Sequence, residues 1–324
     1  MGFLYSQLFV TPRIPDGTDF SGQVILVTGA NTGLGKEAAR HFVSLGAAKV
    51  IIAVRNLEAG EQARKDIIRT TKCPDSVLDV WKLDLGSFSS VESFAERASN
   101  LPRLDVLLEN AGVASNVHAI SEKYERTITV NVISTILLAL LLVPKLKEQV
   151  SEHGTTPRIC IVSSEVHAWT KYKEQDSKDI FATLSDKQTA NMDERYPTSK
   201  LMEVLLVREL APRLKDSGIV MNMINPGLCK TDLSRDRNFQ AFMLSVMKLL
   251  LARTSEQGSR TLVAAAAAGK ESHGRYMTDA LVDDAALSPF VRSEKGAEAG
   301  KELWRQLQPI LDGISPGVTK NVDA

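Results

Sequence analysis

The sequence predicts an α/β fold with a doubly wound, mostly parallel sheet of about seven strands and helices on both faces. From residue 23 onward, short β-branched runs alternate with longer helical patterns, an order that is typical of right-handed βαβ units. Several strand segments are apolar almost throughout, as expected of parallel strands that are covered on both faces. A glycine-rich turn connects the first strand to the first helix.

The elements follow one another regularly as far as residue 232. The predicted strands cover residues 24–28, 49–54, 77–83, 104–108, 158–163, 219–224 and, for a short last strand, about 275–277. The predicted helices cover residues 34–44, 57–70, 87–98, 124–149, 197–214, 239–251, 256–268 and 294–311. A parallel sheet is therefore expected to come first, followed by a mainly helical C-terminal part.

Composition narrows the class of protein. The chain has 324 residues, 44% of them hydrophobic, which is enough to bury a substantial core. Its 39 basic and 39 acidic side chains cancel, so neither nucleic acid nor anionic lipid is an expected partner. Cys73, Cys160 and Cys229 are far apart and form no CxxC pair, which favours a reduced compartment and a cytoplasmic location.

The glycine-rich turn has the pattern of a phosphate-binding loop. Its glycines let backbone N–H groups approach a pyrophosphate, and the positive end of the following helix faces the same anion. The residues expected to contact a dinucleotide there are Gly29, Thr32, Gly33, Leu34, Gly35 and Lys36. The sequence therefore predicts a Rossmann-type nucleotide-binding fold.

Arg55 indicates which dinucleotide binds. It lies 20 residues beyond Gly35, at the end of the second strand, where an NAD-binding fold places a carboxylate for the ribose 2′-hydroxyl. A guanidinium matches a phosphate there, whereas a carboxylate would repel one. The predicted cofactor is therefore NADP(H) rather than NAD.

Two further strand ends complete the predicted cofactor site. Asp84 and Leu85 follow the third strand, where the Asp84 carboxylate can accept a hydrogen bond from the adenine amino group. Asn110, Ala111 and Gly112 follow the fourth strand, and this short glycine-containing turn allows close approach to the nicotinamide-side ribose.

Tyr196 and Lys200 suit acid–base chemistry. They are four residues apart at the start of a helical pattern, so their side chains lie on one helix face. A phenol with a pKa near 10 is a poor acid or base at neutral pH, and an adjacent ammonium is expected to lower that pKa. Ser164 ends the preceding strand and can hold a carbonyl oxygen next to the phenol.

These motifs, in this order, resemble the short-chain dehydrogenase/reductase family. The resemblance runs from about residue 23 to residue 276 and rests on TGANTGLG at 28–35, NAG at 110–112, Asn131, Ser164, YPTSK at 196–200 and the Pro226-Gly227 pair followed by Thr231. It implies that Asn131, Ser164, Tyr196 and Lys200 form a catalytic tetrad, with Asn131 supporting a water relay to Lys200. It also implies that Pro226, Gly227 and Thr231 contact the nicotinamide end.

Within the family, the sequence is most similar to the retinol-dehydrogenase-like branch and its fungal relatives that act on secondary metabolites. Arg55, the chain length and the 274–276 and 303–304 patterns carry this similarity. Two positions depart from the usual pattern: Glu109 replaces the first asparagine of NNAG, and Ser134 replaces a common glycine. Both departures bear on cofactor affinity rather than on the chemistry.

The remaining sequence predicts a division of the chain. Residues 1–22 are expected to form an N-terminal arm, because the apolar start lacks a basic flank and a cleavage site. Residues 23–324 are expected to form one dinucleotide-binding catalytic domain, with a polar insertion near 169–194 and a helical, substrate-capping segment near 233–253. The apolar run 132–143 is too short to cross a bilayer, which takes about 20 residues, so no transmembrane segment is predicted.

Other candidate residues carry less weight. The five histidines and three cysteines show no metal-ligand spacing, so no metal is predicted. His167 is interpreted as a loop histidine without a role, and Cys229 as a bystander thiol. Ser163 and Ser164 lack the G-x-S-x-G context of a hydrolase nucleophile.

The predicted function is NADPH-dependent reduction of a ketone or aldehyde on a lipophilic or aromatic small molecule, with reversible alcohol oxidation. Two alternatives stay open. One is a catalytically silent NADP-binding regulator or scaffold, and the other is an epimerase or dehydratase on the same fold. A homodimer is possible if the helices that carry Asn131 and Tyr196 pair between subunits, as they often do in the family.

Overall fold

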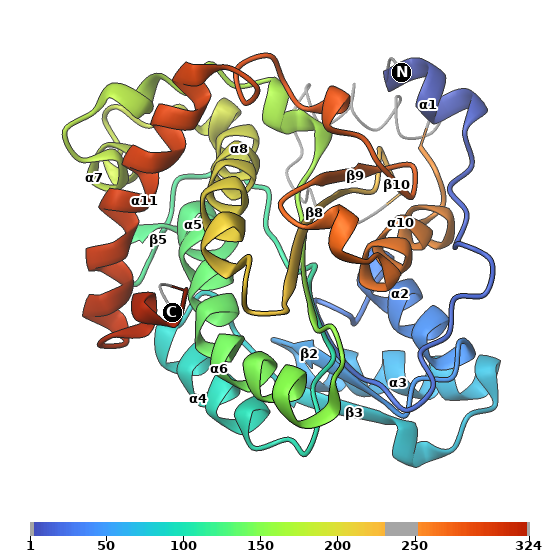
Figure 1. Ribbon diagram of the computed structural model, residues 1–324. Coiled ribbons are helices and arrows are strands. Elements are labelled where there is room, and N and C mark those ends of the chain that lie inside the picture. The colour runs from blue at the N-terminus through green and yellow to red at the C-terminus, as the bar shows by residue number, and fades with distance from the viewer. Residues whose placement is uncertain (1–2, 231–251, 323–324) are drawn as a thin grey trace.

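A central eight-stranded sheet organises the structure, a computed structural model that describes residues 3–230 and 252–322 (Figure 1). The strand order is β10-β9-β8-β7-β4-β1-β2-β3. The strands are β1 Val24–Thr28, β2 Lys49–Val54, β3 Leu78–Lys82, β4 Val106–Glu109, β7 Arg158–Val162, β8 Val220–Asn225, β9 Tyr276–Thr278 and β10 Leu281–Val282. All neighbours pair in parallel except β10, which is antiparallel to β9.

The predicted doubly wound, mostly parallel sheet is confirmed. Each of the seven predicted strands lies within two residues of its observed bounds. The strand of this sheet that was not predicted, β10, has only two residues and is joined to β9 by Asp279 and Ala280, both at positive φ. A strand this short carries no periodic pattern from which it could be recognised.

Helices cover both faces of the sheet (Figure 1). One face packs on α2 Gly33–Ser44, α3 Leu57–Thr71 and α10 Ser255–Ala267, and the other on α4 Phe88–Ser99, α6 Thr135–His153 and α8 Met192–Leu210. Alternation along β1 divides the core accordingly, since Leu26 contributes to one cluster and Ile25 and Val27 to the other.

The C-terminal helix α11, Glu294–Ile314, packs against the outer side of α8 (Figure 1). Its buried side chains include Leu303, Trp304 and Leu307. The turn after it, Val318–Val322, packs on α6, where the Asn321 side-chain amide donates to the Leu140 carbonyl at 3.0 Å. The chain's own C-terminal part therefore covers surface of both long helices.

The long helix predicted over residues 124–149 is observed as one continuous helical run, Arg126–His153, that contains a π-helical segment. A small ribbon, β5 Ile120–Ser121 and β6 Tyr124–Glu125, is followed by the short α5 Arg126–Ile128, a π-helical segment Thr129–Ser134 and then α6. The combined run Arg126–His153 has a mean hydropathy of 2.2 over its most apolar window, so its length and composition would allow it to span a membrane. However, 89% of that window is buried inside the protein, which is the behaviour of a core helix.

The predicted polar insertion, residues 169–194, contains ordered helical structure. A 3₁₀ turn, Lys173–Asp176, leads into α7 Ile180–Ser185, and α8 already begins at Met192, five residues earlier than predicted. Tyr172, Ile180, Phe181 and Leu184 are buried. With so few apolar residues in short turns, no sustained helical period was visible in the sequence.

The N-terminal helix α1, Phe3–Phe9, packs on the loop that follows β8. The Gln7 side chain forms two hydrogen bonds with the backbone of Leu228, at 2.9 and 3.0 Å. Ser6 donates to the Asp279 carboxylate at 2.7 Å, linking α1 to the β9–β10 turn. The predicted capping segment near 233–253 lies outside the described residues except for its last two.

Candidate active site

The predicted phosphate loop and the NAG turn pack against each other at the carboxyl ends of β1 and β4. Thr28 accepts hydrogen bonds at its hydroxyl from the backbone N–H groups of Asn110 and Ala111, at 3.0 and 2.9 Å. The Asn110 amide donates to the Thr28 carbonyl at 2.9 Å. A Cβ on Gly29, which has φ +68°, would lie 2.9 Å from the Ala111 Cα, and one on Gly35 would lie 2.5 Å from the Asn110 amide.

Only glycine therefore allows this close contact between the two turns. Gly33, at φ +58°, begins α2, so the N–H groups of the first helical turn follow the loop directly. Thr32 and Leu34 flank it. This cradle fits the pyrophosphate of a dinucleotide, because it combines close backbone approach with a helix N-terminus.

Two cations lie at the neighbouring ends of β2 and β3, where the second phosphate of NADP is expected. Arg55 is exposed, and the ammonium of Lys82, at the end of the neighbouring β3, donates to the Arg55 carbonyl at 2.7 Å. The sequence prediction did not include Lys82. Its position at the end of the third strand is the signal that could have found it, since adjacent parallel strands end at one edge.

Lys36 lies in the first turn of α2, but its ammonium pairs with Asp66 at 2.7 Å. Asp66 also pairs with Arg40 and Arg69, and the hydrogen bonds from these cations, Lys36 first, hold the pKa of its carboxyl well below the usual range. The charge of Lys36 is therefore largely balanced within the protein. Its contact with the cofactor stays a prediction.

The turn after β3 is fixed by its own hydrogen bonds. Asp84 accepts from the Gly86 N–H at 3.0 Å, and the buried Ser134 hydroxyl donates to the Leu85 carbonyl at 2.7 Å. Ser134, where the family commonly has glycine, thus links the π-helical segment to the predicted adenine-side turn. Both Asp84 and Leu85 lie at the same edge of the sheet as the phosphate loop.

Asn131 lies inside the π-helical segment and is fully buried. Its side chain accepts from the Val113 N–H at 2.9 Å and donates to the Val113 carbonyl and the Ser199 hydroxyl, both at 3.0 Å. A Cβ on Gly112 would lie 3.3 Å from the Asn131 oxygen and 3.7 Å from the Lys200 ammonium. Asn131 therefore connects the predicted ribose-binding turn to the helix that carries Tyr196 and Lys200.

Ser164, Tyr196 and Lys200 come together beside this turn. The Ser164 hydroxyl is within hydrogen-bonding reach of the Tyr196 phenol, and the Lys200 ammonium lies 5.7 Å from the centre of the phenol ring. Lys200 is 4% exposed, and its ammonium donates to the Val162 carbonyl at 2.8 Å. The geometry brings together the three groups that the sequence predicted to act together.

Lys200 lowers the pKa of Tyr196 as the sequence predicted, but the net shift in the structure is upward. Burial raises the pKa of the phenol, and the Glu203 carboxylate raises it further, while Lys200 and the Ser164 hydrogen bond lower it by less. Desolvation outweighs these effects because a phenolate at this partly buried position loses part of its hydration. For Lys200, burial opposes the ammonium form, but Glu203 and Tyr196 outweigh it, so its pKa is raised.

Two residues that the sequence prediction omitted, Gln7 and Arg253, hold the loop after β8 in place. Gly227 has φ +77°, and a Cβ there would lie 2.4 Å from the Gln7 oxygen and 2.8 Å from the Arg253 guanidinium. Arg253 is 5% exposed, pairs with Asp279 at 2.6 Å and donates to the Ser6 and Val10 carbonyls. Pro226 and Gly227 thus lie where the prediction places them, at the carboxyl end of β8, and Thr231 lies outside the described residues.

His167 is not the free loop histidine that the sequence suggested. It is 1% exposed; its Nδ1 lies 2.8 Å from the Ser164 carbonyl and its Nε2 accepts from the Ser288 N–H at 3.1 Å. These bonds define a neutral ring, and burial lowers the pKa of the imidazole. His167 therefore fixes the backbone of Ser164.

The other side chains show no sign of further chemistry. Burial raises the pKa of the Cys229 thiol to about 12, and its sulfur donates to the Pro226 carbonyl, which is consistent with a bystander thiol. Across residues 3–230 and 252–322, no group of three or more His, Cys, Asp or Glu side chains is placed to bind a metal ion.

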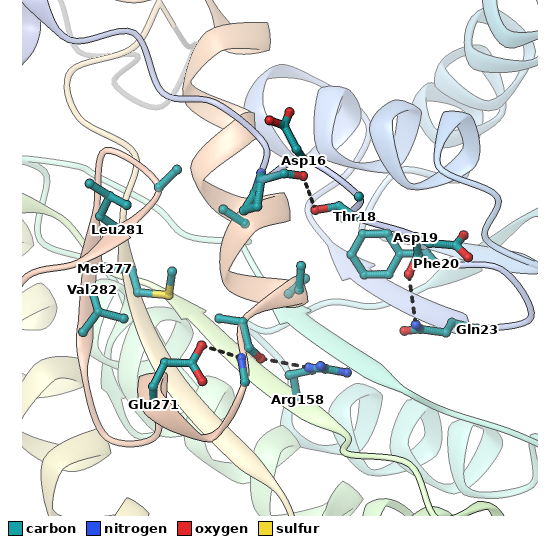
Figure 2. Close-up of a pocket in the computed structure, with 18 residues that line it drawn as sticks. Asp16, Thr18, Asp19, Phe20, Gln23, Arg158, Glu271, Met277, Leu281 and Val282 are labelled. Atoms are coloured by element: carbon teal, nitrogen blue, oxygen red, sulfur yellow. Dashed lines mark hydrogen bonds between the residues drawn. The ribbon is translucent and has the colours of Figure 1, made fainter.

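A hollow of about 580 Å³ lies away from this site (Figure 2). Gln23 and Arg158, which line it, come at the starts of β1 and β7, whereas the catalytic residues follow strand ends. In parallel α/β sheets, ligands bind at the carboxyl ends of the strands. The hollow at the amino ends therefore lies at the opposite edge from the predicted chemistry.

The fold and this grouping of residues define an oxidoreductase that uses a nicotinamide cofactor. Residues 23–176 match the family profile described as short chain dehydrogenase. A short chain dehydrogenase/reductase of Cryptosporiopsis sp. (strain 8999) is 48% identical over 99% of this chain and 100% of its own length. The chain belongs to the short-chain dehydrogenase/reductase family.

Two further comparisons agree. A short chain dehydrogenase of Emericella nidulans is 51% identical over 81% of this chain and 85% of its own length. The structure of a 3-oxoacyl (acyl-carrier-protein) reductase of Agrobacterium tumefaciens C58, solved with NADP bound, superposes with a TM-score of 0.60 at 19% identity, covering 80% of this chain and 93% of that one. At that identity the likeness concerns the fold alone.

Proposed function

We propose that this chain is an NADPH-dependent carbonyl reductase that acts on a ketone or aldehyde of a lipophilic or aromatic small molecule. The observation that carries the proposal is the grouping of Ser164, Tyr196 and Lys200 beside Gly112, within the fold that binds dinucleotides. Such a grouping supplies an acid, a residue that orients the oxygen and a cation at one point.

The described residues also favour NADP(H) over NAD(H). The cofactor would lie on the Gly29–Gly35 loop, with its second phosphate near Arg55 and Lys82. Neither of these cations forms an ion pair with the described part of the chain, so both remain available to an anion. When bound, NADPH supplies the hydride that reduces the carbonyl carbon.

Each catalytic side chain then has a definite task. The Ser164 hydroxyl donates to the carbonyl oxygen and fixes its position. The Tyr196 phenol, whose raised pKa keeps it protonated at neutral pH, gives its proton to that oxygen. The Lys200 ammonium stabilises the phenolate that remains. Alcohol oxidation follows the same steps in reverse.

The substrate class is inferred from side chains near Ser164. Trp169 ends the turn that begins at Ser164 and is 56% exposed, so it offers an aromatic surface close to the reacting oxygen. The sequence adds Phe239, Phe242, Met243 and Met247, in the segment outside the described residues. With the relatives in fungi, this favours a place in secondary metabolism and, with the three unpaired cysteines, in the cytoplasm.

The test is a screen of ketones, aldehydes and alcohols with both nucleotides, followed by absorbance of the reduced nicotinamide. The Tyr196→Phe variant is expected to lose about 10²–10⁴-fold in kcat/KM, the usual contribution of a general acid, while it keeps its affinity for NADPH. Binding without turnover by the wild type would favour a silent regulator. A changed product with no net nicotinamide oxidation would favour an epimerase or dehydratase.

A further inference from the structure

A buried carboxylate on α8 lies directly against the catalytic lysine. Glu203 is 2% exposed and one helical turn beyond Lys200, and its two oxygens lie 2.8 and 3.1 Å from the Lys200 ammonium. With the Val162 carbonyl as the third acceptor, every N–H of the ammonium has a partner. In its ionised form, Glu203 therefore neutralises the Lys200 charge, which would otherwise favour the phenolate form of Tyr196.

A second carboxyl group faces this pair from β4. Glu109, at the end of that strand, is 4% exposed, and neither of its oxygens has a hydrogen-bond partner among the described residues. Burial first, and then the nearby Glu203 carboxylate, raise the pKa of Glu109 well above its usual range. An unpaired buried carboxylate is so costly that the group takes up a proton instead.

Within residues 3–230 and 252–322, the neighbouring side chains from β7 and the π-helical segment are neutral. From β7, the Cys160 thiol has its pKa raised to about 12 by burial and stays neutral. The Ser163 hydroxyl, directly after β7, donates to the Lys200 carbonyl at 3.0 Å, and the π-helical segment contributes the neutral Asn131. Burial raises the pKa of Glu203 to about 7, although the Lys200 ammonium opposes this shift. Above about pH 7 the group of Glu109, Lys200 and Glu203 therefore contains one ammonium and one carboxylate as long as Glu109 keeps its proton.

We propose that Glu203 is a positioning residue that keeps the Tyr196 phenol protonated by neutralising Lys200, with Glu109 as its uncharged partner, and so favours proton donation to a carbonyl. The inference rests on the proposed function, because it assigns the direction in which that same site works best. The sign follows from the charges: an ammonium favours phenolate, and a carboxylate beside it opposes this.

The test is to remove the Glu203 charge and follow the ionisation of Tyr196. In Glu203→Gln, the phenolate absorbance of Tyr196, obtained by subtracting the matching Tyr196→Phe variant, should rise at lower pH than in the wild type, by on the order of one pH unit. The alkaline limit of carbonyl reduction should move to lower pH with it. Glu209→Gln, which removes a carboxylate from the outer part of α8, is the matched control and should move neither.

Two further variants keep the test decisive. Glu203→Asp, which withdraws the carboxylate from the ammonium, should shift the ionisation of Tyr196 in the same direction by a smaller amount. It replaces Glu203→Gln in the test if that variant does not fold. Glu109→Gln, a neutral copy of the protonated acid, should leave the Tyr196 ionisation where it is.

An unmoved Tyr196 ionisation in Glu203→Gln would overturn the proposal and leave Glu203 a purely structural role, visible only as lost stability. A shifted Tyr196 ionisation in Glu109→Gln would show that Glu109 is charged and would overturn its assignment as the uncharged partner. The absorbance measurement needs no substrate. A wild type without turnover would therefore refute the proposed function and still leave the role of Glu203 to be decided.

Discussion

Charged side chains are exposed on the nucleotide side of the sheet and buried on its catalytic side. Around β2 and β3, Arg55 is exposed and Lys36 belongs to a partly exposed ion-pair network. Around α8, by contrast, Glu125, Arg195, Lys200 and Glu203 are all at most 4% exposed. Exposed cations can bind a diffusible anion without a large change in their own ionisation, whereas buried groups acquire the shifted pKa values that proton transfer uses.

The two sides should therefore respond differently to substitution. On the nucleotide side, removing a charge should change cofactor affinity and leave folding nearly unaffected, since surface charges contribute little to stability. On the catalytic side, the same kind of change should alter protonation and stability together, because each buried charge depends on its partner.

The largest expected effect concerns the second buried pair of α8. Arg195 and Glu125 are both fully buried, 3.5 Å apart, and Arg195 also donates to the Leu184 carbonyl of α7 at 2.7 Å. Arg195→Met should lower the free energy of unfolding by about 3–5 kcal/mol, because Glu125 is left buried and unpaired. Denaturant titration measures this, and the double variant with Glu125→Gln should recover much of the loss. If Arg195→Met lowers the free energy of unfolding by less than the loss of an exposed pair such as Arg305 with Glu302 does, the contrast between the two sides is contradicted.

The next effect lies on the nucleotide side. Arg55→Glu should weaken NADPH binding about ten- to hundredfold relative to NADH, because a charge-assisted contact to phosphate is replaced by repulsion. Titration of both nucleotides measures the ratio, and the melting temperature without nucleotide should hardly change. Lys82→Ala should shift the ratio in the same direction by less. Equal affinities in wild type and variant would remove the basis for preferring NADP.

A smaller effect is expected from pH. Because the pKa of Glu109 is higher in the folded protein than its ordinary value of 4.5, the folded state binds that proton more tightly than the unfolded state. Its contribution to stability is therefore greatest in acid and is lost as the pH rises above about 4.5. Between about pH 5 and pH 8, the free energy of unfolding of Glu109→Gln should therefore rise relative to that of the wild type by on the order of 1 kcal/mol. Unfolding at both pH values checks this, and a constant difference would contradict it.

The smallest effect concerns assembly on the catalytic side. The helices that the sequence suggested for a homodimer interface carry the chain's own α11 and Val318–Val322 on their surfaces. We therefore expect no dimer through α6 and α8, and light scattering should give the mass of one 35.4 kDa chain. A stable dimer that dissociates on substitution of exposed α6 or α8 residues would refute this.

Much of the fold and of the nucleotide side could be predicted because the signals are local. The bounds of β1 and β2 follow from apolar, β-branched runs, and the phosphate loop from the spacing of Gly29, Gly33 and Gly35. The pairing of Tyr196 with Lys200 follows from one helical turn. Each of these features depends on residues that are close together in the chain.

Other features depend on contacts between distant segments, and only the tertiary structure decided them. The π-helical segment at Asn131, the burial of His167 against Ser288 and the contacts of Arg253 with α1 join residues that are far apart in the sequence. The protonation state of Tyr196 also depends on the tertiary structure, since both desolvation of the phenol in the fold and the Glu203 carboxylate raise its pKa. The amino-acid order thus determined which groups are present and on which elements they lie. Desolvation and pairing, which exist only in the packed protein, decided their charges.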